Sequence, residues 1–391
     1  MTTKVLYLDH NATTPVAPEV LDQMLPWFSQ TFGNASSKTH AYGWEAAHAV
    51  KKARQQLGQL IAAPAENLTF TSGATEALNL VIRGLAESWK VKKNHLIAWQ
   101  TEHKAVLDTL SRLEKQGFEI SLLPVDKNGL PNTRDLLAAL RPETLLVCGM
   151  LANNESGVIF PVAELSAITH QAGAWFCCDG TQAVGKIAVD VTSLGIDFLV
   201  GSAHKFYGPK GVGFVYQKTG RGAPKLQAQL SGGGHENGLR SGTLNVPAIV
   251  GIGAAARLAE NLLDAEYDRQ IALRNYFEGE LLQKLPECRI MGGAVDRLPN
   301  TSLLYIAHTP AASLLKKLRH IALATGSACS SAEATPSHVL LAMGLTESEA
   351  NCCLRISLGR SNSRAELDEV ICDLLAVVSE VRAESPAWKY R

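Results

Sequence analysis

Short apolar runs rich in β-branched and aromatic residues alternate with amphipathic stretches through the middle of this chain. The apolar runs predict strands at Leu68–Thr71, His95–Trp99, Glu119–Pro124, Thr144–Met150, Trp175–Asp179, Phe198–Gly201 and Gly213–Tyr216. The amphipathic stretches predict helices at Trp44–Ile61, Glu76–Ser88, Lys104–Gln116, Thr133–Ala139 and Val162–Ala172. This alternation indicates an α/β fold, in which a mainly parallel sheet carries helices on both faces. Ligands of such sheets bind beyond the carboxyl ends of the strands.

The pattern changes after residue 260. A long charged helix is expected at Ala255–Leu285, followed by short strands at Thr301–Ile306 and Leu354–Ser357 and a terminal helix from Glu366. These elements predict a smaller α+β domain. Its boundary is not marked by a linker rich in Pro, Gly or Ser.

The 391 residues carry 37 Lys and Arg against 37 Asp and Glu, and 46% of them are apolar. This composition excludes global disorder and argues against bulk binding to nucleic acid or anionic membranes, which needs a basic surface. We expect no membrane span, because no stretch approaches the ~18 uninterrupted apolar residues that a span needs. The N-terminal residues lack the features of a signal peptide, which favours the cytoplasm.

Eight cysteines are spread along the chain, without a CxxC pair. No zinc ribbon and no other metal site is therefore predicted, and in the cytoplasm these residues are thiols rather than bridges. Most lie in apolar runs. Cys329 differs, because it lies among small polar residues in Thr325–Ser331. This context favours an exposed, reactive thiol, and a loop cysteine without function is the alternative.

A turn of Gly, Ser and Thr at Thr71–Glu76 separates a predicted strand from a predicted helix. Free N–H groups and the positive end of the helix dipole would make it an anion site. An ordinary cap by Ser72 or Thr75 is the alternative. The turn lacks the spacing of a Walker A motif.

Two charged residues end or follow apolar strands. Asp179 ends the run WFCCD, where an unpaired carboxylate is costly, so a cation should face it; a turn or capping role is the alternative. Lys205 follows IDFLVGSA directly. Desolvation there would make it a Schiff-base former, and a surface lysine with a buried stem is the alternative.

These segments together fit pyridoxal phosphate, which needs an amine for its aldehyde, a carboxylate for its ring nitrogen and an anion site for its phosphate. His103, after a strand end, is placed to cover the ring, although alone it would indicate only a structural role. The GxGxxA match at Gly251–Ala256 is not taken as a nucleotide site, because Ala248–Leu263 reads as one helix with no full strand before it.

Motifs along nearly the whole chain resemble the cysteine desulfurase family, within the fold-type I, class V aminotransferase group. They include LYLDHNATTP, FGNASSKTHAYGWEA, FTSGATEALNL, TEHKAVLDT, NNESGV, DGTQAVGK, GSAHKFYGPKG, GGGHENGLRSGT, TGSACSS and LRISLGR. The resemblance implies a seven-stranded sheet in a large cofactor-binding domain over residues 16–260. It also implies a small domain made of residues 1–15 and 261–391, which carries the cysteine loop.

The resemblance also implies the role of each site residue. The catalytic residues would be Lys205, which holds the cofactor, His103, which stacks on its ring and moves protons, and Cys329, which takes the sulfur. The cofactor would be bound further by Asp179 at the ring nitrogen, Gln182 at the phenolic oxygen, Asn154, and a phosphate cradle of Ala74, Thr75, Ser202, His204 and, across a homodimer interface, Thr243. The substrate would be bound by Asn11, Asn154 and Arg355.

The implied reaction converts L-cysteine to L-alanine and leaves a persulfide on Cys329. The persulfide sulfur would pass to an acceptor or scaffold protein for iron–sulfur cluster assembly or other thiolation, and transient ligation of such a cluster by Cys329 is part of the same expectation. Gly180, Ala203 and His10 depart from the usual family residues without touching a named role. The alternatives are a selenocysteine lyase, a transaminase or other class V enzyme with the same cofactor, and a sulfur-relay or scaffold-docking protein with little activity of its own.

Overall fold

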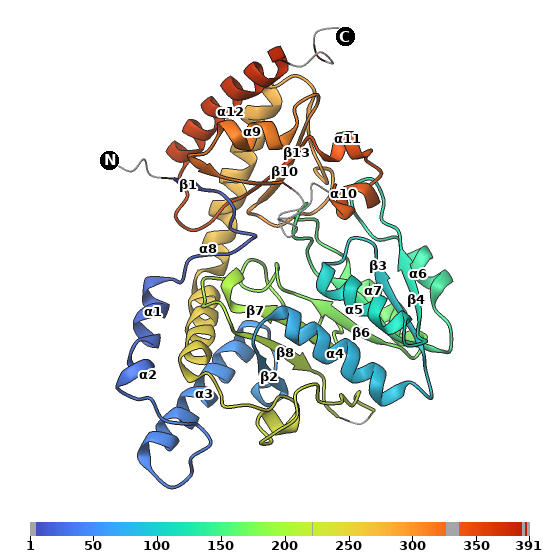
Figure 1. The fold of residues 1–391 in the computed structure, drawn as a ribbon, viewed down its shortest axis with the longest axis vertical. Coiled ribbons are helices and arrows are strands. Elements are labelled where there is room, and N and C mark those ends of the chain that lie inside the picture. The colour runs from blue at the N-terminus through green and yellow to red at the C-terminus, as the bar shows by residue number, and fades with distance from the viewer. Residues whose placement is uncertain (1–4, 221, 326–335, 385–387, 389–391) are drawn as a thin grey trace.

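The computed structural model describes the chain except residues 1–4, 221, 326–335, 385–387 and 389–391. Its centre is a seven-stranded sheet (Figure 1). In spatial order the strands are β2 (Leu68–Thr71), β8 (Gly213–Gln217), β7 (Phe198–Ser202), β6 (Trp175–Asp179), β5 (Thr144–Met150), β3 (His95–Trp99) and β4 (Glu119–Leu123). All pair in parallel except β8, which is antiparallel to both of its neighbours. The expected mainly parallel sheet is confirmed.

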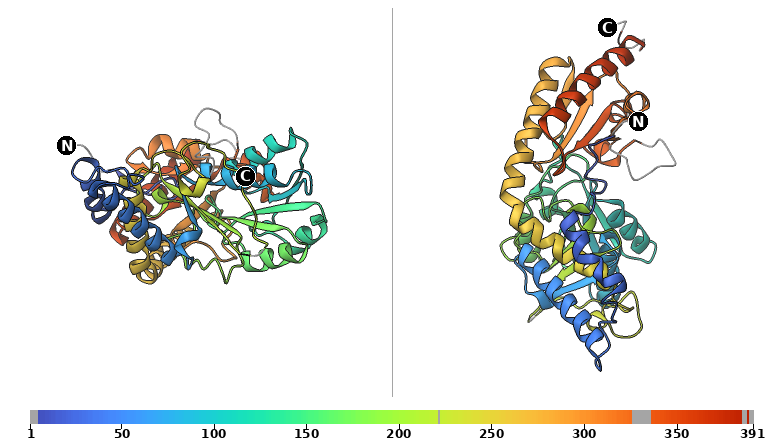
Figure 2. Two further views of the ribbon diagram at one scale, coloured as in Figure 1. Left: turned by 90° about the horizontal axis from the view of Figure 1, so that it is seen from below. Right: turned by 90° about the vertical axis from the view of Figure 1, so that its left-hand side faces the viewer.

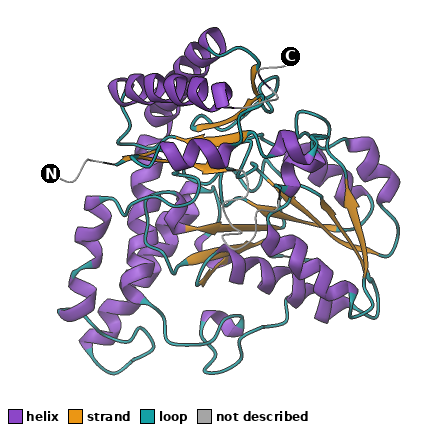
Figure 3. Cartoon of the chain, turned by 45° about the horizontal axis from the view of Figure 1, so that its top comes forward, coloured by secondary structure: helices purple, strands orange, loops and turns teal. Residues whose placement is uncertain are grey.

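Helices cover both faces of this sheet, as expected (Figure 3). Alternate strand residues serve the two faces: Leu146 packs with the helices α4 and α5, whereas Val147 packs on the opposite side. The helices of this part are α1 (Pro18–Met24), α2 (Pro26–Ser29), α3 (Ala41–Leu60), α4 (Ala74–Trp89), α5 (Lys104–Glu114), α6 (Thr133–Ala139) and α7 (Val162–Gln171), with a 3₁₀ turn η1 (Ala65–Asn67).

The predicted helices are found with small shifts at their ends. The helix α3 begins three residues earlier than its apolar pattern suggested, at Ala41, because the side chain of His40 accepts the N–H of Gly43 at 3.3 Å and caps it. The short helices α1 and α2 were not predicted. Each begins with a proline at its first turn, Pro18 and Pro26, which is a start signal too short to show a period.

The C-terminal part holds a smaller sheet with its own core. Its strand order is β12 (Ala324–Thr325), β13 (Cys353–Ser357), β10 (Thr301–Ile306) and β9 (Cys288–Ile290), all antiparallel. Around it lie α9 (Ala311–Lys317), α10 (His338–Ala342), α11 (Glu347–Ala350) and α12 (Arg364–Glu384). The N-terminal strand β1 (Leu6–Tyr7) pairs in parallel with β11 (Ile321–Ala322), so the start of the described chain lies in this part.

The longest helix, α8 (Val246–Lys284), joins the two parts (Figures 1 and 2). It combines the two helical stretches that the sequence suggested separately, Ala248–Leu263 and the one from Ala255 onward. The side chain of Asn245 accepts the N–H of Ala248 and caps the helix, and no break follows before Lys284. The domain limits given above stay a prediction, since α8 runs unbroken through residue 260. By length and composition alone α8 could cross a membrane, but 56% of its most apolar window is buried inside the protein.

The GxGxxA match lies within α8, as the sequence analysis expected, and its glycines serve helix packing. A Cβ on Gly251 would lie 2.6 Å from the sulfur of Met24, and one on Gly253 would lie 2.5 Å from the Cα of Ala53. The glycines therefore let α8 approach α1 and α3 closely.

A buried ion pair fixes α8 to the small domain. The guanidinium of Arg297 donates to both carboxylate oxygens of Glu278, at 2.7 and 2.9 Å, and both side chains are almost fully buried. We predict that Glu278→Ala lowers the free energy of unfolding by about 3–5 kcal/mol, because it leaves a buried charge unpaired. Glu280→Ala, which breaks the exposed pair with Lys284, should cost less than about 1 kcal/mol. Chemical denaturation of both variants measures the difference, and equal losses would contradict the prediction.

Candidate active site

A cavity of about 660 Å³ lies at the carboxyl ends of β5, β6 and β7, where the topology predicted a ligand site. This volume is typical of small-molecule and cofactor sites. The cavity is lined by almost every residue that the sequence singled out: Asn11, Ala74, Thr75, His103, Asn154, Asp179, Gln182, Ser202, His204, Lys205 and Arg355. These residues come from seven separate stretches of sequence, so the fold itself assembles the site.

One end of the cavity is formed by the first turn of α4. Its N-cap is Gly73, which has no side chain to offer, so neither Ser72 nor Thr75 caps the helix and the ordinary-cap alternative is wrong. The early N–H groups of α4 are thus left for a ligand, and the helix dipole favours an anion there.

The carboxylate of Glu76, in the same turn, is compatible with an anion site. Glu76 accepts Nε of Arg240 at 2.9 Å and the N–H of Ser72 at 2.8 Å. Burial raises the pKa of Glu76, but the bonds from Arg240 and Ser72 outweigh burial and hold it below its usual value. The negative charge of Glu76 is therefore offset by Arg240.

Asp179 ends β6 and is 7% exposed. Its Oδ1 accepts the N–H of Thr181 at 2.9 Å, so the turn role considered above accounts for one oxygen. The expected cationic partner is not found: among the described residues no Lys, Arg or His forms an ion pair with Asp179. A buried carboxylate without a cation, facing a cavity, fits a ligand that brings a positive charge.

Lys205 lies in the 3₁₀ turn η2 (Ala203–Lys205), directly after β7. Its amine points inward and donates to the carbonyls of Asn11 at 2.7 Å and Ala12 at 2.8 Å. The surface-lysine alternative is therefore wrong. The two peptide carbonyls orient the amine, and Lys205 lines the cavity.

Two histidines line the same cavity. His103 caps α5, where its Nδ1 accepts the N–H of Ala105 at 3.1 Å, and it also lines the cavity. His204 shares a hydrogen bond of 3.1 Å between Nδ1 and Oγ1 of Thr13. Burial and the nearby charges of Lys205 and Lys210 lower the pKa of His204 to about 4, so this imidazole is neutral near pH 7.

Arg355 of β13 is the contribution of the smaller, C-terminal sheet to the cavity. It is 3% exposed, and its guanidinium donates to Oδ1 of Asp9 at 2.7 Å and to the carbonyl of Asn154 at 3.0 Å. The sequence analysis did not identify Asp9. The residue follows a short apolar run, Leu6–Leu8, and that position alone does not indicate a partner. The pair with Asp9 fixes the guanidinium at the edge of the cavity, where a planar donor can bind a carboxylate.

Gln182 and Asn11 form a small amide network beneath Lys205. Nε2 of Gln182 donates to the carbonyl of Asn11 at 3.0 Å, and its Oε1 accepts the amine of Lys186 at 2.8 Å. The sequence analysis missed Lys186, although it lies within the quoted motif DGTQAVGK. Four residues after Gln182, it has the spacing of a helical neighbour.

Of the predicted site residues that the structure describes, Thr243 is not brought to this cavity. Thr243 is exposed and does not line it, which leaves its side chain available to another molecule. Cys329 lies outside the described residues, so its proposed role and cluster ligation stay predictions. No group of three or more His, Cys, Asp or Glu side chains able to hold a metal occurs in the described part of the chain.

Comparisons with known proteins agree with this geometry. The model of the aminotransferase class-V family matches residues 6–370. "Cysteine desulfurase IscS" of Anaeromyxobacter dehalogenans is 44% identical over 384 residues, which cover 98% of this chain and 95% of that relative.

Solved structures show the same fold. A structure titled "NIFS-LIKE PROTEIN" superposes with a TM-score of 0.89 at 33% identity, covering 96% of this chain and 99% of that one. "SspA in complex with cysteine" superposes with a TM-score of 0.81 at 35% identity, covering 90% and 98%. The chain belongs to the aminotransferase class-V family, whose enzymes use pyridoxal phosphate.

Proposed function

We propose that this protein is a pyridoxal-phosphate-dependent cysteine desulfurase that converts L-cysteine to L-alanine and carries the sulfur as a persulfide on Cys329. One observation carries the proposal: the amine of Lys205, the buried carboxylate of Asp179 and the N-terminus of α4 all line one cavity. These are the three groups that this cofactor needs. The names of the relatives support the same activity.

The cavity residues fit the cofactor. The turn Ala74–Thr75 with Ser202 and His204 would hold the phosphate, Asp179 would meet the ring nitrogen, and His103 would lie on the ring. Gln182 would meet the phenolic oxygen through a turn of its amide away from Asn11. When bound, the cofactor supplies an aldehyde for the substrate amine and an electron sink for the substrate carbon.

Substrate cysteine would bind through its carboxylate to Arg355, with Asn154 and Asn11 beside it. Asp9 must then share the guanidinium with the substrate, which is possible because Arg355 offers five N–H donors. Released from the cofactor, Lys205 is the amine placed to move the proton of the substrate α-carbon. His103 is placed to accept a proton from a thiol that enters the cavity.

The sulfur step needs Cys329 as a thiolate, and a free thiol with a pKa of about 8.5 is only a few per cent ionised near pH 7. The thiolate attacks the sulfur of bound cysteine. A sulfur–sulfur bond forms, the carbon–sulfur bond breaks, and its electron pair stays on the carbon fragment, which is protonated to alanine. Thiol exchange then passes the outer sulfur to an acceptor protein.

A homodimer is part of the proposal. Thr243 lies on a segment that Arg240 ties to α4, and its exposure supports a role at the phosphate bound by the partner subunit. The cytoplasmic location and the acceptor protein also stay proposals. One relative, from Schizosaccharomyces pombe, is named "Probable cysteine desulfurase, mitochondrial".

We predict that Cys329→Ser lowers sulfide release from cysteine by more than about 100-fold, because serine cannot form a persulfide, while the absorption of bound cofactor is retained. Cys372→Ser, at an exposed thiol elsewhere, should behave as the unmodified protein. A sulfide assay with cysteine and a parallel selenide assay with selenocysteine make the measurement. Wild-type sulfide release by Cys329→Ser would remove Cys329 from the reaction, and a preference for selenocysteine would favour the lyase alternative.

We predict that Gly213→Ala weakens the binding of pyridoxal phosphate by about tenfold or more, equivalent to about 1.4 kcal/mol. A Cβ there would lie 2.6 Å from the carbonyl oxygen of Gly201 and 2.6 Å from the Cα of Gly73, so the phosphate cradle has to shift. Gly279→Ala on α8, where the added carbon meets no atom within 4 Å, is the matched control. Titration of cofactor-free protein with pyridoxal phosphate gives both affinities. Equal affinities would mean that this turn does not hold the phosphate.

The role of Thr243 is testable with mixed dimers. A dimer of one Lys205→Ala chain and one Thr243→Ala chain has one intact site if Thr243 serves the partner subunit, and we expect it to keep about half of the wild-type activity. If Thr243 serves its own chain, one site lacks Lys205 and the other lacks Thr243, and the activity falls to about half that of the Thr243→Ala homodimer. Separately tagged chains, purified as the mixed dimer and assayed for sulfide, decide between the two.

A further inference from the structure

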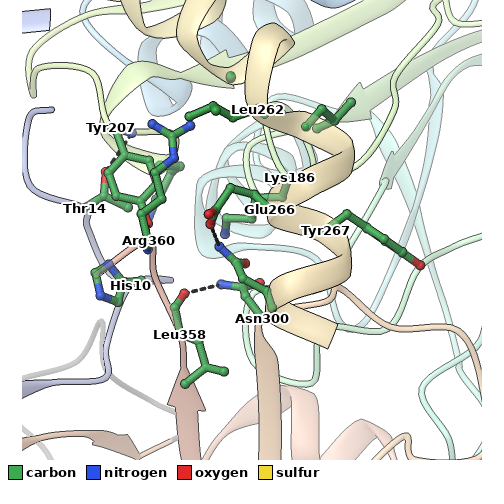
Figure 4. Close-up of a pocket in the computed structure, with 15 residues that line it drawn as sticks. His10, Thr14, Lys186, Tyr207, Leu262, Glu266, Tyr267, Asn300, Leu358 and Arg360 are labelled. Atoms are coloured by element: carbon green, nitrogen blue, oxygen red, sulfur yellow. Dashed lines mark hydrogen bonds between the residues drawn. The ribbon is translucent and has the colours of Figure 1, made fainter. Parts of the chain in front are cut away.

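The C-terminal part of the chain reaches the proposed site from two sides. On one side, Nδ2 of Asn300 donates to the carbonyl of Leu358 and to Oδ1 of Asn11, both at 3.1 Å, and Figure 4 shows the first of these bonds. On the other side lies the start of α10, where Ser337 and His338 bind two loops of the seven-stranded sheet. The sequence analysis gave these two residues no role.

Ser337 binds the loop that carries Asn154. Its hydroxyl donates to Oε2 of Glu155 at 2.5 Å and accepts the N–H of Leu340 at 3.3 Å, so it also caps α10. Ser337 and Glu155 are 5% and 3% exposed, and water therefore does not compete for the bond between them. The bond holds the backbone directly after Asn154, the residue expected at the substrate.

His338 binds the residue before His103. Its Nε2 lies 2.9 Å from the carbonyl oxygen of Glu102. A carbonyl can only accept, so Nε2 carries the hydrogen. Burial lowers the pKa of His338 by more than the bond to Glu102 raises it, so the ring is neutral near pH 7. A neutral imidazole has a single N–H, and this one is spent on Glu102.

Glu102 is fully buried and is held by the large sheet through its other groups. Its N–H donates to the carbonyl of Trp99, at the end of β3, at 3.1 Å. Its Oε1 accepts the N–H of Met150, at the end of β5, at 2.8 Å. His338 adds a bond from the C-terminal part. Because His103 follows Glu102 directly, these bonds also fix the place from which the ring of His103 enters the cavity.

Asn153 joins the two loops to each other. Its Nδ2 donates to the carbonyl of Thr101 at 3.1 Å, and its Oδ1 accepts the N–H of Glu155 at 2.8 Å. Asn153 and Thr101 are each 1% exposed. The stretches 101–103 and 153–155 therefore form one buried hydrogen-bonded unit, and the start of α10 binds both of them.

The helix α10 is itself fixed to the strand that carries Arg355. Its residues Val339 and Leu340 are buried in one apolar cluster with Cys353 of β13. Arg355 lies two residues further along this strand, and its guanidinium donates to the carbonyl of Asn154 at 3.0 Å. The position of α10 is therefore coupled both to the guanidinium and to the two loops that face it.

We propose that Ser337 and His338 are positioning residues: Ser337 places Asn154 for the substrate, and His338 places His103 for proton transfer. The inference rests on the proposed function, because it takes Asn154 and His103 as residues that meet the substrate. Ser337 and His338 do not line the cavity and act only through their neighbours. Loss of the bond from Ser337 should therefore change substrate affinity, and loss of the bond from His338 should change turnover.

The test removes each bond and then restores it. Ser337→Ala and His338→Leu remove the donors, whereas Ser337→Thr keeps a hydroxyl and His338→Gln keeps an N–H. Thr346→Ala is the matched control. Thr346 is exposed and caps α11 at the N–H of Glu349, at 3.3 Å, as Ser337 caps α10, and among the described residues its side chain bonds to Glu349 alone.

The first readout is KM and kcat for sulfide release from cysteine by the full-length holoenzyme. We expect Ser337→Ala to raise KM about tenfold with kcat within about twofold, the effect of one lost buried hydrogen bond on binding. We expect His338→Leu to lower kcat about tenfold with KM within about twofold, because only the proton step is affected. Ser337→Thr and His338→Gln should recover most of each loss, and Thr346→Ala should match the wild type.

The second readout is independent of activity. Hydrogen exchange of the full-length, cofactor-free protein, followed by peptide mass spectrometry, reports on the two loops separately. We expect Ser337→Ala to speed exchange about tenfold in the peptide with the amides of Glu155 and Ser156, which both bond to Asn153. His338→Leu should do the same in the peptide with the amide of Glu102. Thr346→Ala should speed exchange in neither.

Unchanged KM and kcat in folded Ser337→Ala and His338→Leu proteins overturn the proposal. Equal losses in Thr346→Ala also overturn it, because the effect would then come from helix capping alone. If Ser337→Ala does not fold, His338→Leu carries the test with the same outcomes. Failure of the proposed function appears differently: the wild-type protein then neither binds pyridoxal phosphate nor releases sulfide, while the exchange rates still show whether the start of α10 holds the two loops.

Discussion

The hydrogen bonds of Asn11 are the constraint on which the site depends. This residue is 1% exposed, and its carbonyl and side chain together receive Lys205, Gln182 and Lys186. Its own amide group donates to Oγ1 of Thr301 at 2.8 Å, in the small domain. One buried residue of the N-terminal segment thus aligns groups from both parts of the chain, and their relative positions are fixed before any ligand arrives.

The balance of charge in the site follows from the same packing. Lys205 and Arg355 line the cavity, and Asp9, outside it, pairs with the guanidinium of Arg355. The carboxylates that line it lie at distinct points: Asp179 at the strand end and Glu76 against Arg240. The open helix N-terminus adds further positive potential. The site is therefore suited to a ligand with two anionic ends and a cationic centre, which is the charge pattern of a phosphorylated pyridine bound to an amino acid.

Much of this arrangement could be predicted from the sequence. The central strands are continuous apolar runs, and parallel strands bring their carboxyl ends to one edge, so Asp179 and Lys205 could be placed together without a structure. The pair of Arg355 with Asp9 could not, because the partners are 346 residues apart and no period or spacing links their two motifs. The strand Leu6–Tyr7 has two residues, too few to show the alternation of apolar and polar positions that predicts a strand. Its pairing with Ile321–Ala322 depends on tertiary contacts.

The helix α8 has a mechanical consequence. Its first half, with Ile252 and Ala255, belongs to the core beneath the large sheet, whereas Phe277 and Leu281 belong to the core of the smaller one. Cutting the chain within α8 would expose apolar residues of the helix on both fragments. Neither fragment is therefore an independent folding unit. The two parts of the chain should unfold in one thermal transition. Any opening between them has to bend the continuous helix α8, because no flexible linker joins the parts there.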